Sequence, residues 1–277
     1  MKLKKLLAVL LCAAVLISAF FTLCSAGEKQ TQYLVLGDSI GYGAGVANPE
    51  FGAFGRIVAD TDGFGYTNDA VSGHTSADLL SRLSDPTVAS HVANADIISV
   101  SIGGNDFMRI TAKLIADARK GDMTRFEQIK ATFETNFDKI VTRLRALSPD
   151  CVIVAQTLYN PAPTESTRQL YDAAISRVND VITSYPGILV SDVAAAFAGR
   201  NELIAADNVH PNAEGNVVIA RTVLKTLYDN GLGTETEPVI TVPGRNWAEP
   251  AGASILTSIR VFFVRIIEFF RRLFRVS

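Results

Sequence analysis

Short apolar runs alternate with longer amphipathic segments along most of this 277-residue chain. The runs with the length and continuous apolar character of buried strands are Tyr33–Leu36, Tyr66–Val71, Asp96–Ile102, Cys151–Leu158 and Ile188–Val190. The segments between them with helical periodicity are Phe51–Ala59, Ser76–Leu83, Thr124–Leu147, Glu165–Ser184 and Ala213–Tyr228. Apolar strands separated by helices are typical of a parallel sheet covered on both faces. The pattern therefore predicts a three-layer α/β/α fold.

The composition is that of a globular protein with an acidic body. Apolar residues make up 48% of the chain and charged residues 19%, which is enough apolar material for a full-size core. The formal net charge is −2, but both ends are basic, and the part between Gly27 and Ala253 holds 18 basic and 27 acidic side chains. Because phosphate binding needs basic patches, we expect no nucleic-acid partner.

The first 26 residues have the pattern of an export signal. Lys2, Lys4 and Lys5 precede an uncharged stretch, Leu6–Leu23, which ends in the small residues Ser25 and Ala26. We expect cleavage after Ala26 and a secreted protein, with an uncleaved membrane anchor as the alternative, since the apolar stretch is long. Only Cys151 would then remain, and its apolar surroundings predict a small buried hydrophobe without a disulfide.

Four polar clusters follow the predicted strands. They are Gly37-Asp38-Ser39-Ile40, the segment around Gly73, Gly103-Gly104-Asn105-Asp106, and Asp207-Asn208-Val209-His210 after the last strand and a short connection. Working residues of open parallel sheets lie in loops beyond the carboxyl ends of the strands. We therefore expect all four clusters at one edge of the sheet, where they would form a single site.

Ser39, His210 and Asp207 are the residue types that nucleophilic catalysis requires. A serine hydroxyl is a poor nucleophile until a neutral imidazole takes its proton, and a carboxylate must hold that imidazole in the correct tautomer. Other interpretations stay open at this point. Gly-Asp-Ser is a common turn, and Asp207–His210 could begin the following helix. His74 and His91 are competing bases, but neither has an acid three residues earlier. We interpret His74 as a pocket-lining residue and His91 as a surface or loop residue.

The four clusters resemble the blocks of the SGNH hydrolase family, the GDSL-type esterases and lipases. The resemblance spans Gln32 to Asp229, with Ile40 in place of the usual leucine, and the block around Gly73 is the weakest of the four. It implies a flavodoxin-like SGNH hydrolase fold over residues 27–231 and a carboxylic ester hydrolase. The G-x-S-x-G elbow of α/β-hydrolases also fits Gly37–Gly41, but there several strands precede the serine, whereas Ser39 follows the first.

The resemblance assigns roles by position. Ser39 would be the nucleophile, His210 the general base and then acid, and Asp207 the residue that orients the imidazole, with Asp38 in support. The oxyanion would be held by the backbone N–H groups of Ser39 and Gly73 and by the Asn105 side-chain amide. A glycine at 73 would keep the acyl group from being crowded.

This chemistry requires no cofactor. The three histidines are dispersed, no cysteine pair has metal-ligand spacing, and neither a Walker loop nor a dinucleotide fingerprint is present. We accordingly expect no metal.

The C-terminal part predicts a second, non-catalytic element. Residues 232–253 lose periodicity and contain three prolines, which is typical of a linker. Residues 254–277 then place five arginines on one side of a helix and phenylalanine, isoleucine and leucine on the other. Such a helix lies in a membrane interface, because each arginine at the bilayer centre would cost about 2.5 to 3.5 kcal/mol. The alternative is a helix that packs on the catalytic domain or on a partner.

These features predict a secreted serine ester hydrolase held at a membrane surface. The resemblance leaves lysophospholipids, simple acyl esters and O-acetylated sugars open as substrates, and the tail favours lipids. A hypothesis of another class is a non-catalytic envelope protein that uses the same fold to bind carbohydrate or a partner.

Overall fold

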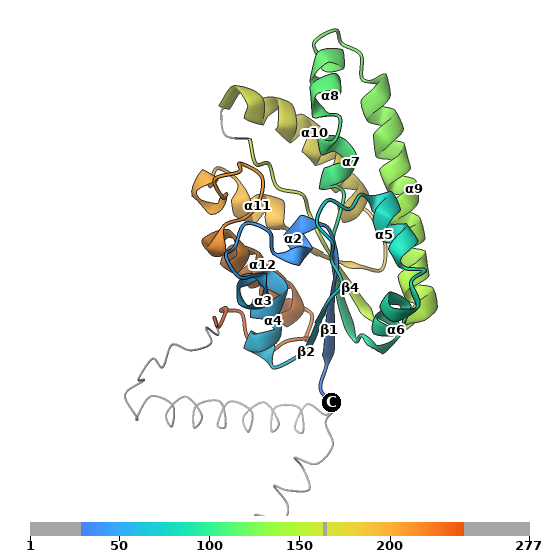
Figure 1. Cartoon of the computed structure of the whole chain (residues 1–277), viewed down its shortest axis with the longest axis vertical. Coiled ribbons are helices and arrows are strands. Elements are labelled where there is room, and N and C mark those ends of the chain that lie inside the picture. Colours follow the sequence, from blue (N-terminus) through green and yellow to red (C-terminus); the bar gives the residue numbers. More distant parts are fainter. Residues whose placement is uncertain (1–28, 163–164, 241–277) are drawn as a thin grey trace, which may run out of the picture. The chain divides into compact units, whose positions relative to one another are not determined.

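The computed structural model describes residues 29–162 and 165–240, and its centre is a five-stranded parallel sheet (Figure 1). The strands are β1 (Gln32–Gly37), β2 (Gly65–Asn68), β3 (Ile97–Ser101), β4 (Val152–Gln156) and β5 (Leu189–Ser191), in the order β2-β1-β3-β4-β5. All four neighbouring pairs are parallel. This is the flavodoxin-like order of a doubly wound sheet, so the predicted architecture is confirmed.

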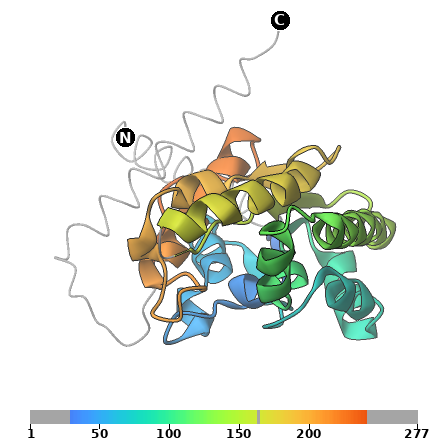
Figure 2. The same ribbon diagram turned by 90° about the horizontal axis from the view of Figure 1, so that it is seen from above.

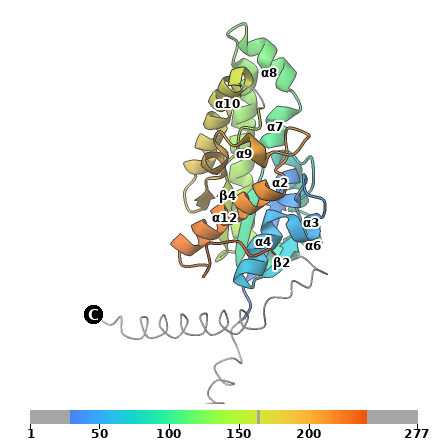
Figure 3. The ribbon, with the colours of Figure 1, turned by 90° about the vertical axis from the view of Figure 1, so that its left-hand side faces the viewer.

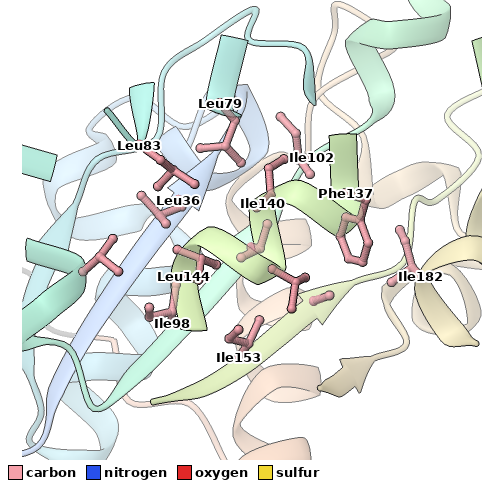
Figure 4. Packing of buried hydrophobic residues seen from close by; sticks show 14 of the residues in the cluster. Leu36, Leu79, Leu83, Ile98, Ile102, Phe137, Ile140, Leu144, Ile153 and Ile182 are labelled. Carbon is pink, nitrogen blue, oxygen red and sulfur yellow. The ribbon is translucent and has the colours of Figure 1, made fainter. Parts of the chain in front are cut away.

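Helices cover both faces of the sheet (Figures 1 and 3). One face packs against α4 (Phe54–Asp62), α11 (Val193–Phe197) and α12 (Ala213–Asp229). The other packs against α5 (Ser76–Arg82), α6 (Pro86–Asn94), α9 (Thr124–Leu147) and α10 (Glu165–Thr183). Each face has its own core of buried apolar side chains. Figure 4 shows the second core, where Ile140 and Leu144 of α9 lie over Leu36 of β1 and Ile98 of β3.

The remaining helices are short, and several of them lie beyond the carboxyl ends of the strands. They are α2 (Ser39–Tyr42), α3 (Pro49–Gly52), α7 (Gly104–Met108), α8 (Thr111–Ala118) and the 3-10 turn η1 (Asn201–Leu203). Helix α2 continues directly from β1, and α7 follows β3. Figure 2 looks down on this edge, with the green α7 and α8 and the olive α10 toward the viewer. The edge that was predicted to hold the polar clusters is therefore covered by separate short helices.

The predicted helix Phe51–Ala59 was wrong in one respect, because the structure contains two helices with a break at Ala53. Ala53 has extended backbone angles, φ −68° and ψ 141°. The N–H group of Phe54 donates to the side-chain oxygen of Asn216 on α12 at 3.0 Å, so α4 begins with a cap from a distant residue. A single helix across Ala53 would forgo this contact.

The described chain ends with a segment that contacts α4. In the predicted linker 232–253, residues up to 240 are described, and they contain neither helix nor strand. Asp62 accepts hydrogen bonds from the N–H groups of Thr234 and Glu235, at 2.9 and 3.1 Å, and Thr61 Oγ1 accepts from Val239 N at 2.8 Å. None of the helices in the described ranges is long and apolar enough to cross a membrane. The predicted export signal and C-terminal helix lie outside the described residues.

Candidate active site

The turn that carries Ser39 is fixed by a close approach between β1 and β3. Gly37, at the end of β1, has φ +134°, and a Cβ atom built there would lie 1.9 Å from the carbonyl oxygen of Ser101. The N–H group of Asp38 donates to the same oxygen at 2.9 Å. Only glycine fits this position, since both the backbone angle and the contact exclude a side chain. The sheet thus sets where the chain leaves β1 and presents Ser39.

Asp38 caps the helix that begins with Ser39. Its Oδ1 atom accepts hydrogen bonds from the N–H group of Ile40 at 3.0 Å and from Ser101 Oγ at 3.3 Å. The side chain is buried, and burial raises its pKa to about 7 against the lowering effects of these hydrogen bonds and of His210. Asp38 thus holds the start of the helix that carries Ser39 through a backbone contact.

His210 joins Ser39 to Asp207. The Nε2 atom of His210 lies 2.8 Å from Ser39 Oγ, and its Nδ1 atom lies 2.6 Å from Asp207 Oδ2. The other carboxylate oxygen of Asp207 accepts from the backbone N–H groups of Val209 and His210, both at 3.0 Å. The structure brings together the three residues that the sequence predicts, in the order of a serine, histidine and acid triad.

The electrostatics of Asp207 select one tautomer of the imidazole. Its burial raises the pKa, but the hydrogen bonds from the His210 side chain and from the N–H groups of His210 and Val209 outweigh this and lower the pKa to about 2. Asp207 is thus an ionised acceptor at neutral pH, so Nδ1 of His210 carries the hydrogen. Nε2 is then free to accept the proton of Ser39 Oγ.

The loop that carries this pair is held mainly by short-range hydrogen bonds. Ala205 N donates to the carbonyl oxygen of His210 at 2.8 Å, and Asn208 has φ +58°. The hydroxyl of Tyr159 donates to Val209 O at 2.5 Å and ties the loop to the end of β4. Helix α12 begins only at Ala213, so the alternative that Asp207–His210 opens this helix does not hold.

Asn105 lies in the same cavity as Ser39, and it contacts the loop of Gly73. One hydrogen of its side-chain amide goes to the carbonyl oxygen of His74 at 3.0 Å. Gly73 has φ +83°, and no atom lies within 4 Å of the position that a Cβ would take. The positive φ angle is therefore one reason for a glycine at this position. The predicted reason, that a side chain would crowd the acyl group, is a second and separate one.

Asp106 of α7 and Arg109, the residue directly after α7, make two further contacts that sequence reasoning missed. The first is to the start of α5 and the second is to the Gly73 loop. The carboxylate of Asp106 accepts from Ser76 N at 2.9 Å and from Ser76 Oγ at 2.5 Å. Arg109 Nη2 donates to the carbonyl oxygen of Gly73 at 2.7 Å. Arg109 lies four residues after Asn105, which puts both on one side of a helix, and this spacing was the available signal.

The two competing histidines do not contact Ser39. His74 lines a shallow polar pocket with Asp78, Ser81, Arg82 and Asp85, and burial lowers its pKa. His91, predicted to be a surface or loop residue, lies in α6 with its side chain 38% exposed, and its Nδ1 atom is 2.7 Å from Asp69 Oδ2. Among the described histidines, the one bonded to Ser39 is His210.

A largely apolar cavity of about 480 Å³ opens beside Ser39. Its walls come from α7, α8, α9 and α10 and include Phe107, Met108, Leu114, Phe126, Ile175 and Val178. Ser39, Asp38 and Asn105 line its catalytic end. The sequence did not predict this cavity, because the wall residues of α7, α8, α9 and α10 lie next to one another only in the folded chain. Volumes of about 300 to 1,000 Å³ are usual for small-molecule sites.

Within residues 29–162 and 165–240, no group of three or more histidine, cysteine or acidic side chains is placed to hold a metal ion. Cys151 is buried, as the sequence predicts, and burial raises the pKa of its thiol.

Comparisons with known proteins place the chain in one family. Residues 35–218 match the GDSL-like Lipase/Acylhydrolase family. The chain is 27% identical over 198 residues to the spore germination lipase LipC of Bacillus licheniformis, an alignment that covers 66% of this chain and 90% of that protein. It is also 25% identical over 182 residues to the uncharacterized protein YpmR of Bacillus subtilis, covering 61% of this chain and 68% of that one.

Solved structures show the same fold. The lipase Lip_vut3 from a goat rumen metagenome superposes with a TM-score of 0.63 at 26% identity, covering 72% of this chain and 98% of that one. Phospholipase A1 from Streptomyces albidoflavus superposes with a TM-score of 0.54 at 21% identity, covering 73% and 99%. The fold and the site define a carboxylic ester hydrolase. Within that class, the chain belongs to the GDSL-like lipase/acylhydrolase family, as its sequence blocks predict.

Proposed function

We propose that this protein hydrolyses acyl esters through a Ser39–His210–Asp207 triad. The observation that carries the proposal is the unbroken hydrogen-bonded chain, 2.8 Å from Ser39 Oγ to His210 Nε2 and 2.6 Å from His210 Nδ1 to Asp207 Oδ2. Both distances are within the range in which a base takes a proton from a nucleophile.

The chemistry has two symmetrical halves. Ser39 Oγ attacks the carbonyl carbon of the ester while its proton passes to Nε2 of His210, and a tetrahedral oxyanion forms. The imidazolium then returns the proton to the alcohol oxygen, the alcohol leaves, and the acyl group remains on Ser39. A water molecule repeats both steps and releases the acid. Asp207 stays ionised throughout and stabilises the imidazolium.

The oxyanion is stabilised by the backbone N–H groups of Ser39 and Gly73 and by the second hydrogen of the Asn105 amide. Among the described residues, no protein oxygen accepts a hydrogen bond from Gly73 N, which leaves this donor for substrate. One amide hydrogen of Asn105 is bound to His74, so a single one remains for the oxyanion. Loss of one such donor costs about 10²-fold to 10³-fold in kcat.

The cavity favours a lipid acyl chain as the substrate group. An acetyl group would leave most of a 480 Å³ apolar cavity empty, whereas a long alkyl chain would bury its methylenes there. Each buried methylene contributes about 0.8 kcal/mol, so the cavity selects for chain length. The relative from Bacillus licheniformis is named a lipase, which agrees with this choice. Lysophospholipids and other single-chain esters are accordingly preferred over O-acetylated sugars.

The place of action is also a proposal, and its support is in the sequence. Residues 1–26 have the pattern of an export signal, and residues 254–277 that of a basic amphipathic helix. We infer a secreted enzyme that acts at a membrane surface. Co-sedimentation of the full chain with anionic vesicles, and its loss after deletion of residues 254–277, is the expected result. Equal sedimentation of both proteins would contradict the membrane role of the tail.

The catalytic proposal is tested by hydrolysis of p-nitrophenyl esters from acetate to palmitate, with Ser39→Ala and His210→Ala as matched variants. We expect kcat/KM to rise from acetate to the medium and long chains, and both variants to lose activity. An optimum at acetate would instead favour a deacetylase. Absence of hydrolysis across the whole series would favour a binding protein on the same fold.

A further inference from the structure

The loop that presents Gly73 is held by hydrogen bonds more than by packing. A turn closes it, with His74 N donating to Val71 O at 3.2 Å, and Val71 N donates to Gly37 O at 3.0 Å. At Gly73 itself φ is +83°, and the direction of a Cβ is empty to 4 Å. Glycine rotates more freely than other residues, so nothing intrinsic to Gly73 fixes how its peptide groups are turned. Their orientation depends on external partners.

Those partners come from α7 and from the residue that follows it. Asn105 Nδ2 donates to the carbonyl oxygen of His74 at 3.0 Å, and Arg109 Nη2 donates to the carbonyl oxygen of Gly73 at 2.7 Å. The two side chains thus bind successive carbonyl groups of the loop. The bond from Arg109 comes from a charged donor, and such bonds are shorter and stronger than neutral ones. Arg109 is therefore the stronger of the two anchors.

Arg109 is itself oriented from the far side of the loop. Its Nη2 atom lies 3.3 Å from Asp78 Oδ2, and Asp78 forms the capping box of α5 with Thr75. The backbone hydrogen bond from Thr75 is the main reason that the pKa of Asp78 is lowered, so its carboxylate is charged at neutral pH. Among described residues, the cavity lining includes Met108 but not Arg109. Arg109 thus contacts the loop and not the cavity that we assign to the acyl chain.

We propose that Arg109 is a positioning residue that fixes the Gly73–His74 peptide. Together with the turn between Val71 and His74, this anchor limits rotation about Gly73 and so keeps its N–H group directed at the oxyanion. This inference rests on the proposed function. Without Arg109, the hydrogen bond from Asn105 would be the remaining side-chain bond, among the described residues, to the carbonyls of Gly73 and His74. Asn105 is also the side-chain donor to the oxyanion, so movement of the loop would disturb two of the three donors together.

The experiment compares Arg109→Ala, Arg109→Gln and Arg109→Lys in the full chain, with the neutral substrate p-nitrophenyl butyrate. Fluorophosphonate titration counts the active sites, and kcat is expressed per labelled site. Arg109→Ala is expected to lower kcat by about 10-fold to 100-fold with little change in KM, because the transition state is affected more than the bound ester. Arg109→Lys is expected to recover part of the loss, and Arg109→Gln less, since lysine keeps the charge and glutamine only a neutral donor.

Arg221→Ala is the matched control. Arg221 is also half-exposed and also bonded to one carboxylate, Glu237 at 3.2 Å, but it lies on α12 and has no contact with the site. It is expected to keep the wild-type kcat. Thermal unfolding of each variant identifies a general loss of structure, and if Arg109→Ala unfolds, Arg109→Gln and Arg109→Lys carry the test.

Two results would overturn the assignment. One is a kcat per labelled site equal to that of the wild type in all folded Arg109 variants. The other is a raised KM for the neutral ester at unchanged kcat, which would make Arg109 a substrate-binding residue. Absence of labelling in the wild type would refute the proposed function itself, so the two failures are distinguishable.

Discussion

The two halves of the candidate triad are held in place by different means. Ser39 is 9% exposed. It lies just after the end of β1, which is fixed by its pairing with β3. Asp207 and His210 lie on a loop whose bonds are mostly to its own backbone, and the side chain of Asp207 is 48% exposed. The sheet core thus places the proposed nucleophile, while short-range hydrogen bonds place the proposed base and acid.

This difference predicts how each half responds to change. Alterations around Ser39 should affect the stability of the whole domain, because the same contacts join the central strands. Alterations in the loop should affect catalysis and leave the fold nearly intact. The following changes, ordered from the largest expected effect to the smallest, would break or sharpen the contrast.

Asp207→Asn should give the largest effect, a loss of about 10⁴-fold in kcat at nearly unchanged stability. The amide can donate to Nδ1 of His210 and so favours the wrong tautomer. Kinetics on a p-nitrophenyl ester, together with urea unfolding, measures both quantities. Asp229→Asn is the matched control, since Asp229 is also half-exposed and paired, here with Lys225. A residual activity within tenfold of the wild type would show that Asp207 does not act on His210.

Gly37→Ala should destabilise the domain by more than about 4 kcal/mol. The new methyl group would overlap the carbonyl oxygen of Ser101, at 1.9 Å, and the backbone angle is unfavourable as well. Gly187→Ala separates the two causes, because Gly187 also has a positive φ, +75°, but no atom within 4 Å of its Cβ direction. The control should lose only about 1 to 2 kcal/mol in urea unfolding. Equal losses would remove the argument from close approach.

Asp38→Asn tests the buried carboxyl through the pH dependence of stability. The folded-state pKa of Asp38, about 7, lies above that of an unfolded aspartate. The folded protein therefore binds the proton more tightly between about pH 4 and about pH 7, and the free energy of unfolding falls as pH rises through that window. The amide of the variant cannot titrate, so the variant should lack this contribution, and the two stability curves should diverge. Parallel curves in urea unfolding would mean that Asp38 stays charged.

Tyr159→Phe should have the smallest effect, a loss of about 1 kcal/mol in stability and a modest loss in kcat. It removes the hydrogen bond to Val209 O and leaves that carbonyl unpaired, while the ring keeps its stacking on Phe197. Tyr185→Phe, which removes a more exposed bond to Asp138, is the control. If kcat stays unchanged while stability falls, the loop holds His210 without help from Tyr159.

The sequence was sufficient for the elements whose pattern is local. All five strands and the long helix Thr124–Leu147 follow from apolar runs and helical spacing. The proposed triad residues follow from short motifs, Ser39 just after the end of β1 and Asp207 and His210 beyond α11 and η1. Helix α6 was missed although Asp85 and Pro86 are a normal helix start. The break at Ala53 could not be predicted, because it depends on a hydrogen bond between Phe54 and Asn216. The cavity and the contact of Arg109 with Gly73 likewise exist only after distant segments meet.

The most direct test of the triad is the site and rate of fluorophosphonate labelling in the folded full chain. A fluorophosphonate reacts with an activated serine, and mass spectrometry identifies the modified residue. We predict one adduct per chain, on Ser39, and a fall of at least about 10³-fold in the labelling rate in His210→Ala, since the imidazole no longer takes the proton. An adduct elsewhere, or a rate that does not depend on His210, would contradict the account.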